Sequence, residues 1–435
     1  MSAPATSAAP SYYEATADRG PPRAPLAGAH DAEVCIVGAG FAGLATALGL
    51  VERGVQGIVL LEAGRIACGA SGRNGGFVFG GYSLGGAELV AQLGAEEARA
   101  CYGLTQTAVD LIRHRIAAYA IECEAVDGGA LLANWFDDDA VLDREQRLLR
   151  EHFGVEWRRI GRDELARQVV TTRYSGALFE PDAFHFHPLK YALGIARAAQ
   201  AGGVLLHEHS AVRAVERLAD GRFRVATDGG TLRARHVVIA GGGTLRGVLP
   251  AIERAMLPIA TYVMATEPLG ARLEALIPSR AAIYDTRFAF DYYRRLNDTR
   301  LLWGGRISVR DRRPEQIARF LRADMLRVFP SLEDARIDFA WGGLMSYARH
   351  KMPQIGRMDG GALAGVWHAC GFGGHGVAPT TVAGEALAEA ISGRRPLPDA
   401  FRRYGLARTW RPFGLLAAQA AYHLAELKDA WRGRR

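Results

Sequence analysis

Hydrophobic and polar positions follow two periods along the chain, and these periods predict both helices and strands. Residues Glu33 to Val37 form a short apolar run that predicts a buried strand. Gly40 to Val51 predicts an apolar helix, and Gly57 to Leu61 predicts a second buried strand that ends at Glu62. This order of strand, glycine turn, helix and strand is typical of the start of a parallel sheet.

The rest of the chain continues this mixture of helical and extended patterns. Helices are expected where apolar positions recur every three or four residues, and strands where they alternate. Asp220-Gly221 predicts a hairpin turn between two strands. The expected helices are residues 96–118, 137–152, 188–202, 314–329 and 382–392, and the expected strands are 122–133, 204–208, 212–217, 223–227, 236–240 and 365–369, with an alternating aromatic segment at 257–307 that fits antiparallel strands.

The length of the chain indicates more than one domain. It has 435 residues, whereas single hydrophobic cores stop growing near about 250–300 residues. About half of the residues are apolar, so a sizeable core is possible. We therefore expect an α/β chain folded into two interleaved domains.

The most informative motif is Gly38-Ala39-Gly40-Phe41-Ala42-Gly43, between a predicted strand and a predicted helix. The first glycine permits the tight turn, the second lets the backbone approach a pyrophosphate, and the third lets the helix pack on the strand. The helix N-terminus then offers free N–H groups to phosphates. Glu62 ends the next strand, where a carboxylate accepts hydrogen bonds from ribose hydroxyls. The alternatives are a close helix–strand contact for the glycines and a solvated strand end for Glu62, and the motif does not distinguish NAD from FAD.

Composition and charge argue against a nucleic-acid-binding, metal-binding, membrane-inserted or secreted protein. The formal charge is +7, but the basic residues form no block, so we expect no nucleic-acid partner. The five cysteines form no C-x-x-C pair, which predicts reduced thiols in a cytoplasmic protein without disulfide or metal. No apolar stretch of about 20 residues is present, so no stable membrane insertion is expected. The first thirty residues lack a secretory signal, and Tyr12 and Tyr13 suggest that this arm docks on the body.

Two further glycine-rich blocks extend the motif. Residues 63–76, AGRIACGASGRNGG, could wrap closely around a bulky ring system. Residues 370–377, CGFGGHGV, open a predicted helix. A helix N-terminus is suited to the negative charge that a reduced flavin carries at its pyrimidine end.

With these blocks the sequence resembles the D-amino-acid oxidase, glycine oxidase and sarcosine oxidase superfamily of FAD enzymes. The resemblance spans most of the chain, and the order of its blocks is more specific than any single block. Within the superfamily the sequence is most similar to the gamma-glutamylputrescine oxidase-like branch, of which the segment SYYEATA at residues 11–17 is typical. The five blocks are VGAGFAGL at 37–44, LEAGRIACGASGRNGG at 61–76, VVIAGGG at 237–243, PQIGR at 353–357 and GFGGHGV at 371–377.

The resemblance implies an α/β fold, α+β overall, with a Rossmann-like FAD-binding domain around a parallel sheet and a substrate domain with a large antiparallel sheet. The FAD-binding domain would be discontinuous. The implied segments are an N-terminal arm at 1–30, the FAD-binding domain at 31–110, 185–256 and 335–400, the substrate domain at 111–184 and 257–334, and a C-terminal helical extension at 401–435.

The resemblance also implies which residues hold FAD. The cofactor is expected to be non-covalent, because residues 346–350 lack the cysteine to which some sarcosine oxidases attach it. Arg73 has an alternative role as a structural clamp, and His375 as a donor to a neighbouring carbonyl. The implied contacts are Gly38, Gly40, Phe41, Ala42, Gly43, Glu62 and Ala63 at the ADP half, Ala70, Ser71, Arg73, Asn74, Gly75 and Gly76 at the ribityl chain and ring, Val212 at adenine, Gly241 and Gly242 at the pyrophosphate, and Gly373, His375, Gly376 and Val377 at the pyrimidine end.

The implied reaction moves a hydride from the carbon beside an amine nitrogen to the flavin, and the imine product then hydrolyses. The expected partners are a small amine or amino acid and molecular oxygen. Lys351, His375, Tyr262 and Tyr292 are the candidate catalytic residues, although Lys351 could be a solvated loop lysine. An aromatic pocket that attracts a cationic substrate is expected from Tyr262, Tyr284, Phe288, Phe290, Tyr292 and Tyr293, with Arg294 nearby, and the alternative is that these are ordinary sheet residues.

Three other functions stay open at this point: a quinone-linked amino-acid dehydrogenase, a non-catalytic flavin-binding redox sensor, and a tRNA-modifying flavoenzyme. Residues 410–431 carry apolar side chains at helical spacing. This segment is expected to be a helix packed on the body or on a partner subunit. Its alternative, a membrane-surface anchor, would suit the dehydrogenase. The sequence predicts no oligomeric state.

Overall fold

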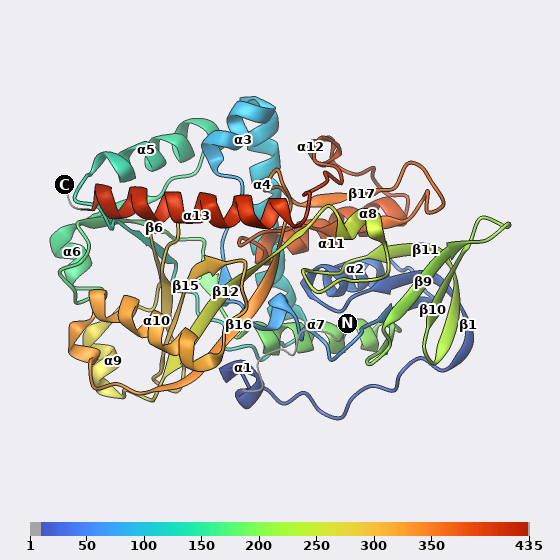
Figure 1. The fold of residues 1–435 in the computed structure, drawn as a ribbon, viewed down its shortest axis with the longest axis horizontal. Helices are drawn as coiled ribbons and strands as arrows, with labels where there is room; N and C mark the ends of the chain where they lie inside the picture. The colour runs from blue at the N-terminus through green and yellow to red at the C-terminus, as the bar shows by residue number, and fades with distance from the viewer. Residues whose placement is uncertain (1–9, 434–435) are drawn as a thin grey trace.

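Two halves, each built around one large sheet, make up the protein (Figure 1). The computed structural model describes residues 10–433. Residues 1–9 of the expected N-terminal arm and residues 434–435 of the expected C-terminal extension lie outside this range. The described part of the arm docks on the body as expected, because Tyr12 and Tyr13 are both buried.

The first sheet is mainly parallel and contains the buried strands expected around the glycine turn. β1 lies at its centre and pairs in parallel with β2 and β11, as apolar strands buried on both faces do. An antiparallel strand, β17, forms one edge, and an antiparallel pair extends β11. The order is β17 (Gln354–Arg357), β18 (Trp367–Cys370), β11 (Gly230–Ile239), β1 (Gly28–Val37), β2 (Ile58–Leu61) and β8 (Leu205–His207), with β10 (Phe223–Thr227) beside β11 and β9 (Val212–Arg217) beside β10.

Four helices pack around this sheet or on each other. α2 is buried from Phe41 to Leu50 because apolar residues cover all of its faces. It packs on α11, where a Cβ at Gly384 would lie 2.5 Å from the Cβ of Ala45, so the glycine permits the close approach. The helices are α2 (Phe41–Val51), α4 (Ala95–Ala118), α7 (Pro188–Ala201) and α11 (Val377–Ile391).

The second sheet is large and antiparallel, except where β13 runs parallel to β4. Helix α10 (Pro314–Val328) covers its outer face with the fully buried side chains of Ile317, Leu321 and Met325. The other face turns toward the first half. The order is β16 (Ile337–Tyr347), β12 (Leu257–Thr266), β15 (Leu301–Ser308), β14 (Tyr292–Arg295), β13 (Ala282–Asp285), β4 (Ala130–Ala133), β6 (Gly176–Glu180) and β5 (Arg158–Gly161).

One expected segment boundary differs from the strand pairing. Residues 335–400 were assigned to the FAD-binding domain, but β16 pairs with β12 in the large sheet along nearly its whole length. Chain order does not show this, because β16 and β17 are separated by a short loop although they lie in different sheets. The crossing from one sheet to the other therefore lies near residues 348–353.

The remaining elements are short or peripheral. The charged helix expected at 137–152 is α5, which continues into a wider π-helical turn at Leu149–Phe153. Near the C-terminus, the red helix α13 (Phe413–Arg432) runs across the half that contains the antiparallel sheet (Figure 1). The elements not yet named are α1 (Tyr12–Thr16), α3 (Gly86–Leu93), α5 (Ala140–Leu148), α6 (Arg162–Ala166), α8 (Pro250–Glu253), α9 (Ala271–Leu276), α12 (Asp399–Arg402), α13 (Phe413–Arg432), the pair β3 (Phe77–Val78) and β7 (Phe184–His185), and 3-10 turns at Ala70–Gly72 and Pro330–Leu332.

The described residues contain free cysteines but neither a membrane-spanning helix nor a cluster of metal-ligating side chains. All five cysteines are free. Within residues 10–433, no helix is long and apolar enough to cross a membrane. In the same range, no cluster of three or more metal-ligating side chains is present.

Candidate active site

A cavity of about 2240 Å³ lies between the two sheets. The first half contributes the glycine turn after β1, the loop after β2 and the start of α11. The second half contributes the inner face of the antiparallel sheet. Crevices at the carboxyl ends of parallel strands are where dinucleotides bind in open α/β sheets.

The glycine turn at one end of the cavity has no room for side chains. Gly38 has a φ of +107°, and a Cβ there would lie 2.8 Å from the carbonyl oxygen of Ala240. A Cβ at Gly43 would lie 1.9 Å from the carbonyl oxygen of Gly38. A Cβ at Gly40 would lie 3.0 Å from the Ser71 Oγ. Bare backbone at these positions forms a surface to which a pyrophosphate could come close.

Glu62 and Ser71 connect the turn to the loop that follows β2. The Glu62 carboxylate accepts hydrogen bonds from the backbone N–H groups of Ala39 and Gly64, at 2.8 and 2.9 Å. The Ser71 hydroxyl accepts one from the N–H of Phe41, at 2.9 Å, in the first turn of α2. Both side chains line the cavity, so the predicted ribose acceptor is held in place before any ligand binds.

Other expected cofactor residues also border the cavity. Val212 lies at the start of β9, as predicted. Gly376 and Val377 mark the N-terminus of α11, which points its free N–H groups toward the cavity side. The expected positions in the lining are Gly38, Gly40, Phe41, Ala42, Glu62, Ala63, Ala70, Ser71, Arg73, Asn74, Gly75, Val212, Gly241, Gly242, Gly373, His375, Gly376 and Val377, whereas Gly43 and Gly76 lie behind it.

The loop at residues 70–76 is stiffened from inside. The Asn74 amide donates hydrogen bonds to the carbonyls of Ala70 and Ser71, and its oxygen accepts the N–H of Gly76. Gly76 has a φ of +78°, and a Cβ there would lie 2.1 Å from the Phe186 carbonyl oxygen. This loop therefore presents a fixed surface to the cavity.

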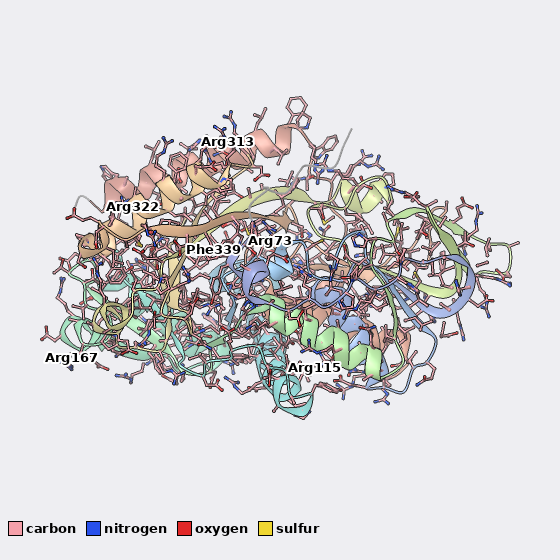
Figure 2. All side chains as sticks on the ribbon, turned by 90° about the horizontal axis from the view of Figure 1, so that it is seen from below. Arg73, Arg115, Arg167, Arg313, Arg322 and Phe339 are labelled. Carbon is pink, nitrogen blue, oxygen red and sulfur yellow. The ribbon has the colours of Figure 1, made fainter. Side chains whose placement is uncertain are left out.

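Arg73 acts as a clamp between the two halves and lies at the centre of the molecule (Figure 2). Its Nε donates to the Gly342 carbonyl of β16 at 2.8 Å, and the Trp341 indole N–H donates to the Arg73 carbonyl at 2.9 Å. Burial lowers the pKa of the guanidinium. The structural alternative for Arg73 is thus supported, and the side chain still lines the cavity.

An aromatic wall lies beside the glycine-rich loop; it comprises Tyr284, Phe290 and Tyr292 of the second half and Phe77 and Phe79, which follow the loop. The Tyr292 ring fills space that two glycines leave open, because a Cβ at Gly304 would lie 2.1 Å from its Cζ and one at Gly75 would lie 2.6 Å from its ring. Tyr284 stacks on Phe79 with centroids 5.5 Å apart. Of the six aromatic residues expected in the pocket, Tyr284, Phe288, Phe290 and Tyr292 line the cavity.

Tyr262 and Tyr293 are not part of that wall, and the prediction of Tyr262 as a catalytic residue is wrong. Alternate residues of a strand point to opposite faces. Thr261 lines the cavity, so Tyr262 points to the α10 side, where its hydroxyl donates to the Arg310 carbonyl. Tyr293 likewise stacks on Trp303, with centroids 4.4 Å apart.

Arg294 also lies outside the wall. It is buried behind the loop, where it donates to the carbonyls of Gly75 and Phe186. Its charge is therefore used to fix the loop and does not face the substrate side of the cavity.

His375 lines the cavity and is neutral at ordinary pH. Burial lowers its pKa to about 4. Its Nε2 donates to the Gly80 carbonyl at 2.7 Å, and its backbone N–H donates to the Ser83 hydroxyl at 3.1 Å. These contacts match the alternative of a bond to a neighbouring carbonyl, and they hold the loop before α11 against the segment after β3.

Lys351 lies on the rim of the cavity. Its side chain is half exposed, and its Nζ forms an ion pair with the Glu88 carboxylate at 3.3 Å. This placement favours the loop interpretation, because a lysine paired at the surface does not point into the aromatic wall.

Sequence reasoning missed the part of the cavity lining that comes from β16 and from the segment after β3. Residues 342–347 of β16 line the cavity, as does Ser83. Burial raises the pKa of the Tyr347 hydroxyl. The expected domain boundary assigned this strand to the other half, so its residues were not considered for the site.

The C-terminal helix α13 covers the cavity with a face of small residues. Ala417, Ala421 and Ala425 line the cavity from this helix. Gln419 accepts the N–H of Val309 at 3.1 Å, and the Asp429 carboxylate accepts the N–H of Phe288 at 2.8 Å. The expectation of a helix packed on the body is confirmed.

A buried acid lies just behind the wall, and it predicts a pH dependence of stability. Glu180 is only 6 % exposed, and its Oε2 has no hydrogen-bond partner within the described residues. Burial raises its pKa to about 8, from 4.5. Between these values the folded protein holds a proton that the unfolded chain releases, so the free energy of unfolding should fall as the pH rises and level off above about pH 8.

Glu180→Gln is expected to remove this loss, because the amide cannot ionise. Calorimetry measures the melting temperature of both proteins. The variant minus parent difference should be more positive at pH 8 than at pH 5. Glu216→Gln on the exposed β9 is the matched control and should leave the difference between the two pH values unchanged. Parallel curves for Glu180→Gln and the parent would show that the acid is not buried in its protonated form.

The residues that surround the cavity fit FAD. A bare glycine turn and a helix N-terminus suit its pyrophosphate, and a fixed acid suits its ribose. The loop at residues 70–76 and the aromatic wall line the same cavity, which is large enough to hold a ring system. Cys68 is the cysteine in the cavity lining; its Sγ lies 3.7 Å from the Glu62 carboxylate, and burial raises the pKa of its thiol to about 11.

Comparison with known proteins also indicates an FAD-dependent enzyme. The family model described as "DAO: FAD dependent oxidoreductase" matches residues 33–390. Gamma-glutamylputrescine oxidoreductase of Escherichia coli K12 is 34% identical over 393 residues, which cover 90% of this chain and 91% of that protein. A probable oxidoreductase OrdL of Haemophilus influenzae is 34% identical over 380 residues, 85% of each chain.

Solved structures share the fold at lower identity. Glycine oxidase from Geobacillus kaustophilus has a TM-score of 0.70 at 20% identity, covering 87% of this chain and 99% of that one. L-amino acid deaminase from Proteus myxofaciens has a TM-score of 0.71 at 20% identity, covering 91% and 96%. The match of the family model, the identity to the E. coli relative and the site together show that this chain belongs to the DAO family of FAD-dependent oxidoreductases.

Proposed function

We propose that this enzyme oxidises the C–N bond of a small amine or amino acid of the gamma-glutamylputrescine kind, with FAD bound non-covalently and molecular oxygen as the final acceptor. The observation that carries the proposal is the aromatic wall, which lines the cavity beside the glycine-rich loop. The name and the 34% identity of the E. coli relative support the choice of substrate class.

FAD, when bound, supplies the acceptor for the hydride, so the protein needs to position the carbon and keep the amine neutral. The wall suits both tasks. Its rings exclude water, and a dry surrounding lowers the pKa of an amine. Before the amine loses its proton, the faces of Tyr292 and Tyr284 attract it as a cation.

The side chains around the wall are uncharged. The Tyr292 hydroxyl lies beside Thr261, and burial raises its pKa, so it stays protonated. His375 is neutral because burial lowers its pKa to about 4. Neither group would repel a cationic substrate, and neither is charged to act as a strong base, which agrees with hydride transfer from an amine that has already lost its proton.

Three charged residues of the second half lie toward the rim of the cavity. Arg306, Asp311 and Arg349 line the outer part of the cavity. Arg306 pairs with Asp324, and Asp311 and Arg349 are exposed. A substrate with an amino-acid head and a terminal amine could place its charged head at this rim while the amine enters the wall.

The direct test is anaerobic reduction of the purified yellow protein, followed by absorbance in the flavin band. Gamma-glutamylputrescine, putrescine, sarcosine, glycine and D-alanine are added separately, and air is then admitted. Bleaching by gamma-glutamylputrescine and recolouring with peroxide are the expected results. Bleaching without recolouring would instead favour a dehydrogenase, and no bleaching by any amine would contradict the substrate class.

Tyr292→Ala is expected to slow this reduction by about a hundredfold, because loss of the ring opens the wall to water and removes a positioning surface. Tyr292→Phe keeps the ring and should stay within about tenfold of the parent. Stopped-flow absorbance measures both rates, and flavin content checks that the cofactor is retained. Tyr119→Ala, on the exposed end of α4, is the control; an equal loss there, or no loss in Tyr292→Ala, would remove the wall from the mechanism.

A further inference from the structure

The outward side of α13 is apolar over its whole length, although it faces solvent. Phe413, Leu416, Leu424 and Leu427 are 73, 66, 68 and 67 % exposed. Their spacing of three, eight and three residues keeps them on one side of a helix with 3.6 residues per turn. The helix has no buried residue. We call these four residues the α13 stripe, of which Phe413 also borders the cavity.

Tryptophans and cations border the α13 stripe. Trp410 and Trp431 lie at the two ends and are 63 and 59 % exposed. The acids of the helix do not face outward with the stripe: Asp429 accepts the Phe288 N–H, and Glu426 accepts from His423. Exposed cations near the helix outnumber the exposed acids Asp399 and Glu426: they are Arg402, Arg403, Arg408, Arg411 and Lys428.

The stripe lies on an outer side of the molecule. In Figure 1 α13 crosses the front of the half that contains the antiparallel sheet and ends near the middle of the molecule, and in Figure 2 it lies along the upper left edge. Arg313, which precedes α10, and Arg322 of α10 lie on the same side in Figure 2. A flat surface could therefore touch the whole length of the helix, and it would meet positive charge around an apolar ridge.

We propose that α13 is an interfacial helix that adsorbs, lying flat, on an anionic lipid surface. A helix with an apolar side and flanking basic residues enters the boundary between headgroups and acyl chains. Tryptophan favours that same boundary, and Arg and Lys attract anionic headgroups. A second copy of this chain fits less well, because antiparallel pairing of two α13 stripes would bring Arg408 and Arg411 of one copy toward Lys428 of the other.

Adsorption would hold the cavity at the lipid surface. The side of α13 next to the stripe carries Ala417, Ala421 and Ala425, which line the cavity. The helix would lie in the plane of the membrane surface and would not cross it. The proposal does not depend on which substrate the cavity takes.

The test is co-sedimentation of the FAD-loaded protein with vesicles of phosphatidylcholine alone and of phosphatidylcholine mixed with phosphatidylglycerol. The parent should bind the mixed vesicles, bind pure phosphatidylcholine at least about tenfold less, and lose binding at high salt. Leu416→Glu/Leu424→Glu should reduce binding to the mixed vesicles by at least about tenfold. Neither leucine lines the cavity.

Leu205→Glu is the matched control. Leu205 is 59 % exposed and lies on β8, at the edge of the first sheet and far from α13 in the sequence. It should bind vesicles like the parent. Flavin content and melting temperature check that each variant is folded. Absence of parent binding to either vesicle, equal binding by the double variant, or a parent dimer that the double variant dissociates in light scattering would each overturn the proposal.

Discussion

Gly43→Ala is expected to yield a protein that no longer retains FAD. The new Cβ would lie 1.9 Å from the carbonyl oxygen of Gly38, which is far inside van der Waals contact. Both partners are backbone, so α2 would have to move away from β1. That movement displaces the helix N-terminus from the pyrophosphate position, and we expect FAD affinity to fall by more than about a hundredfold. The ratio of flavin to protein absorbance after purification measures the loss.

Gly103→Ala provides the control for this change. Gly103 lies inside α4, and a Cβ there would meet nothing within 4 Å. Alanine is a better helix former, so this variant should keep its flavin and gain up to about 1 kcal/mol in the free energy of unfolding. If Gly43→Ala kept the parent's flavin ratio, the turn would not be the pyrophosphate site.

The two clearest sequence signals were those in which backbone chemistry decides the structure. The glycine turn, β1, α2 and Glu62 appear where the motif predicted them, because a close approach of backbone to backbone admits only glycine. The same reasoning explains the hairpin of β9 and β10, whose bounds match the prediction.

The residues that line the cavity were less predictable, because pairing with neighbouring strands decides which side chains of a strand point into the cavity. Tyr262 and Tyr292 belong to the same aromatic segment, yet only Tyr292 faces the cavity. A one-residue difference in register reverses the face, and the pairing of β12 with β15 shifts between Thr261 and Tyr262. No pattern within the segment itself distinguishes these two tyrosines.

Contacts between segments that lie far apart in the chain could not be predicted from the sequence either. The pairing of β16 with β12 and the covering of the cavity by α13 join residues that lie far apart in the chain. The amphipathic pattern of α13 predicted a helix but could not show which side would face the cavity. Ala417, Ala421 and Ala425 line the cavity together with Phe413 and Tyr422, whereas Leu416, Leu424 and Leu427 are exposed.

Arg115→Met is expected to destabilise the fold by about 3 kcal/mol. Arg115 of α4 is fully buried and donates to the carboxylates of Glu52 and Glu385, each at 2.5 Å (Figure 2). Burial alone would lower its pKa, but the two glutamates raise it above the ordinary value. Methionine fills a similar volume, so the main cost is two carboxylates left close together without a counter-charge. Urea unfolding followed by circular dichroism measures the change.

Two further variants separate lost charge pairing from lost packing. Arg224→Met breaks an exposed ion pair with Glu216 on the β9–β10 hairpin and should cost less than about 1 kcal/mol. The triple change Arg115→Met/Glu52→Gln/Glu385→Gln removes the unpaired carboxylates, so it should recover part of the stability that Arg115→Met loses. If the triple variant were as unstable as Arg115→Met, packing of the arginine stem would hold α4 to α11, and the ion pairs would contribute little. Recovery would show instead that the junction of α2, α4 and α11, at the C-terminal end of α2, depends on one buried cation.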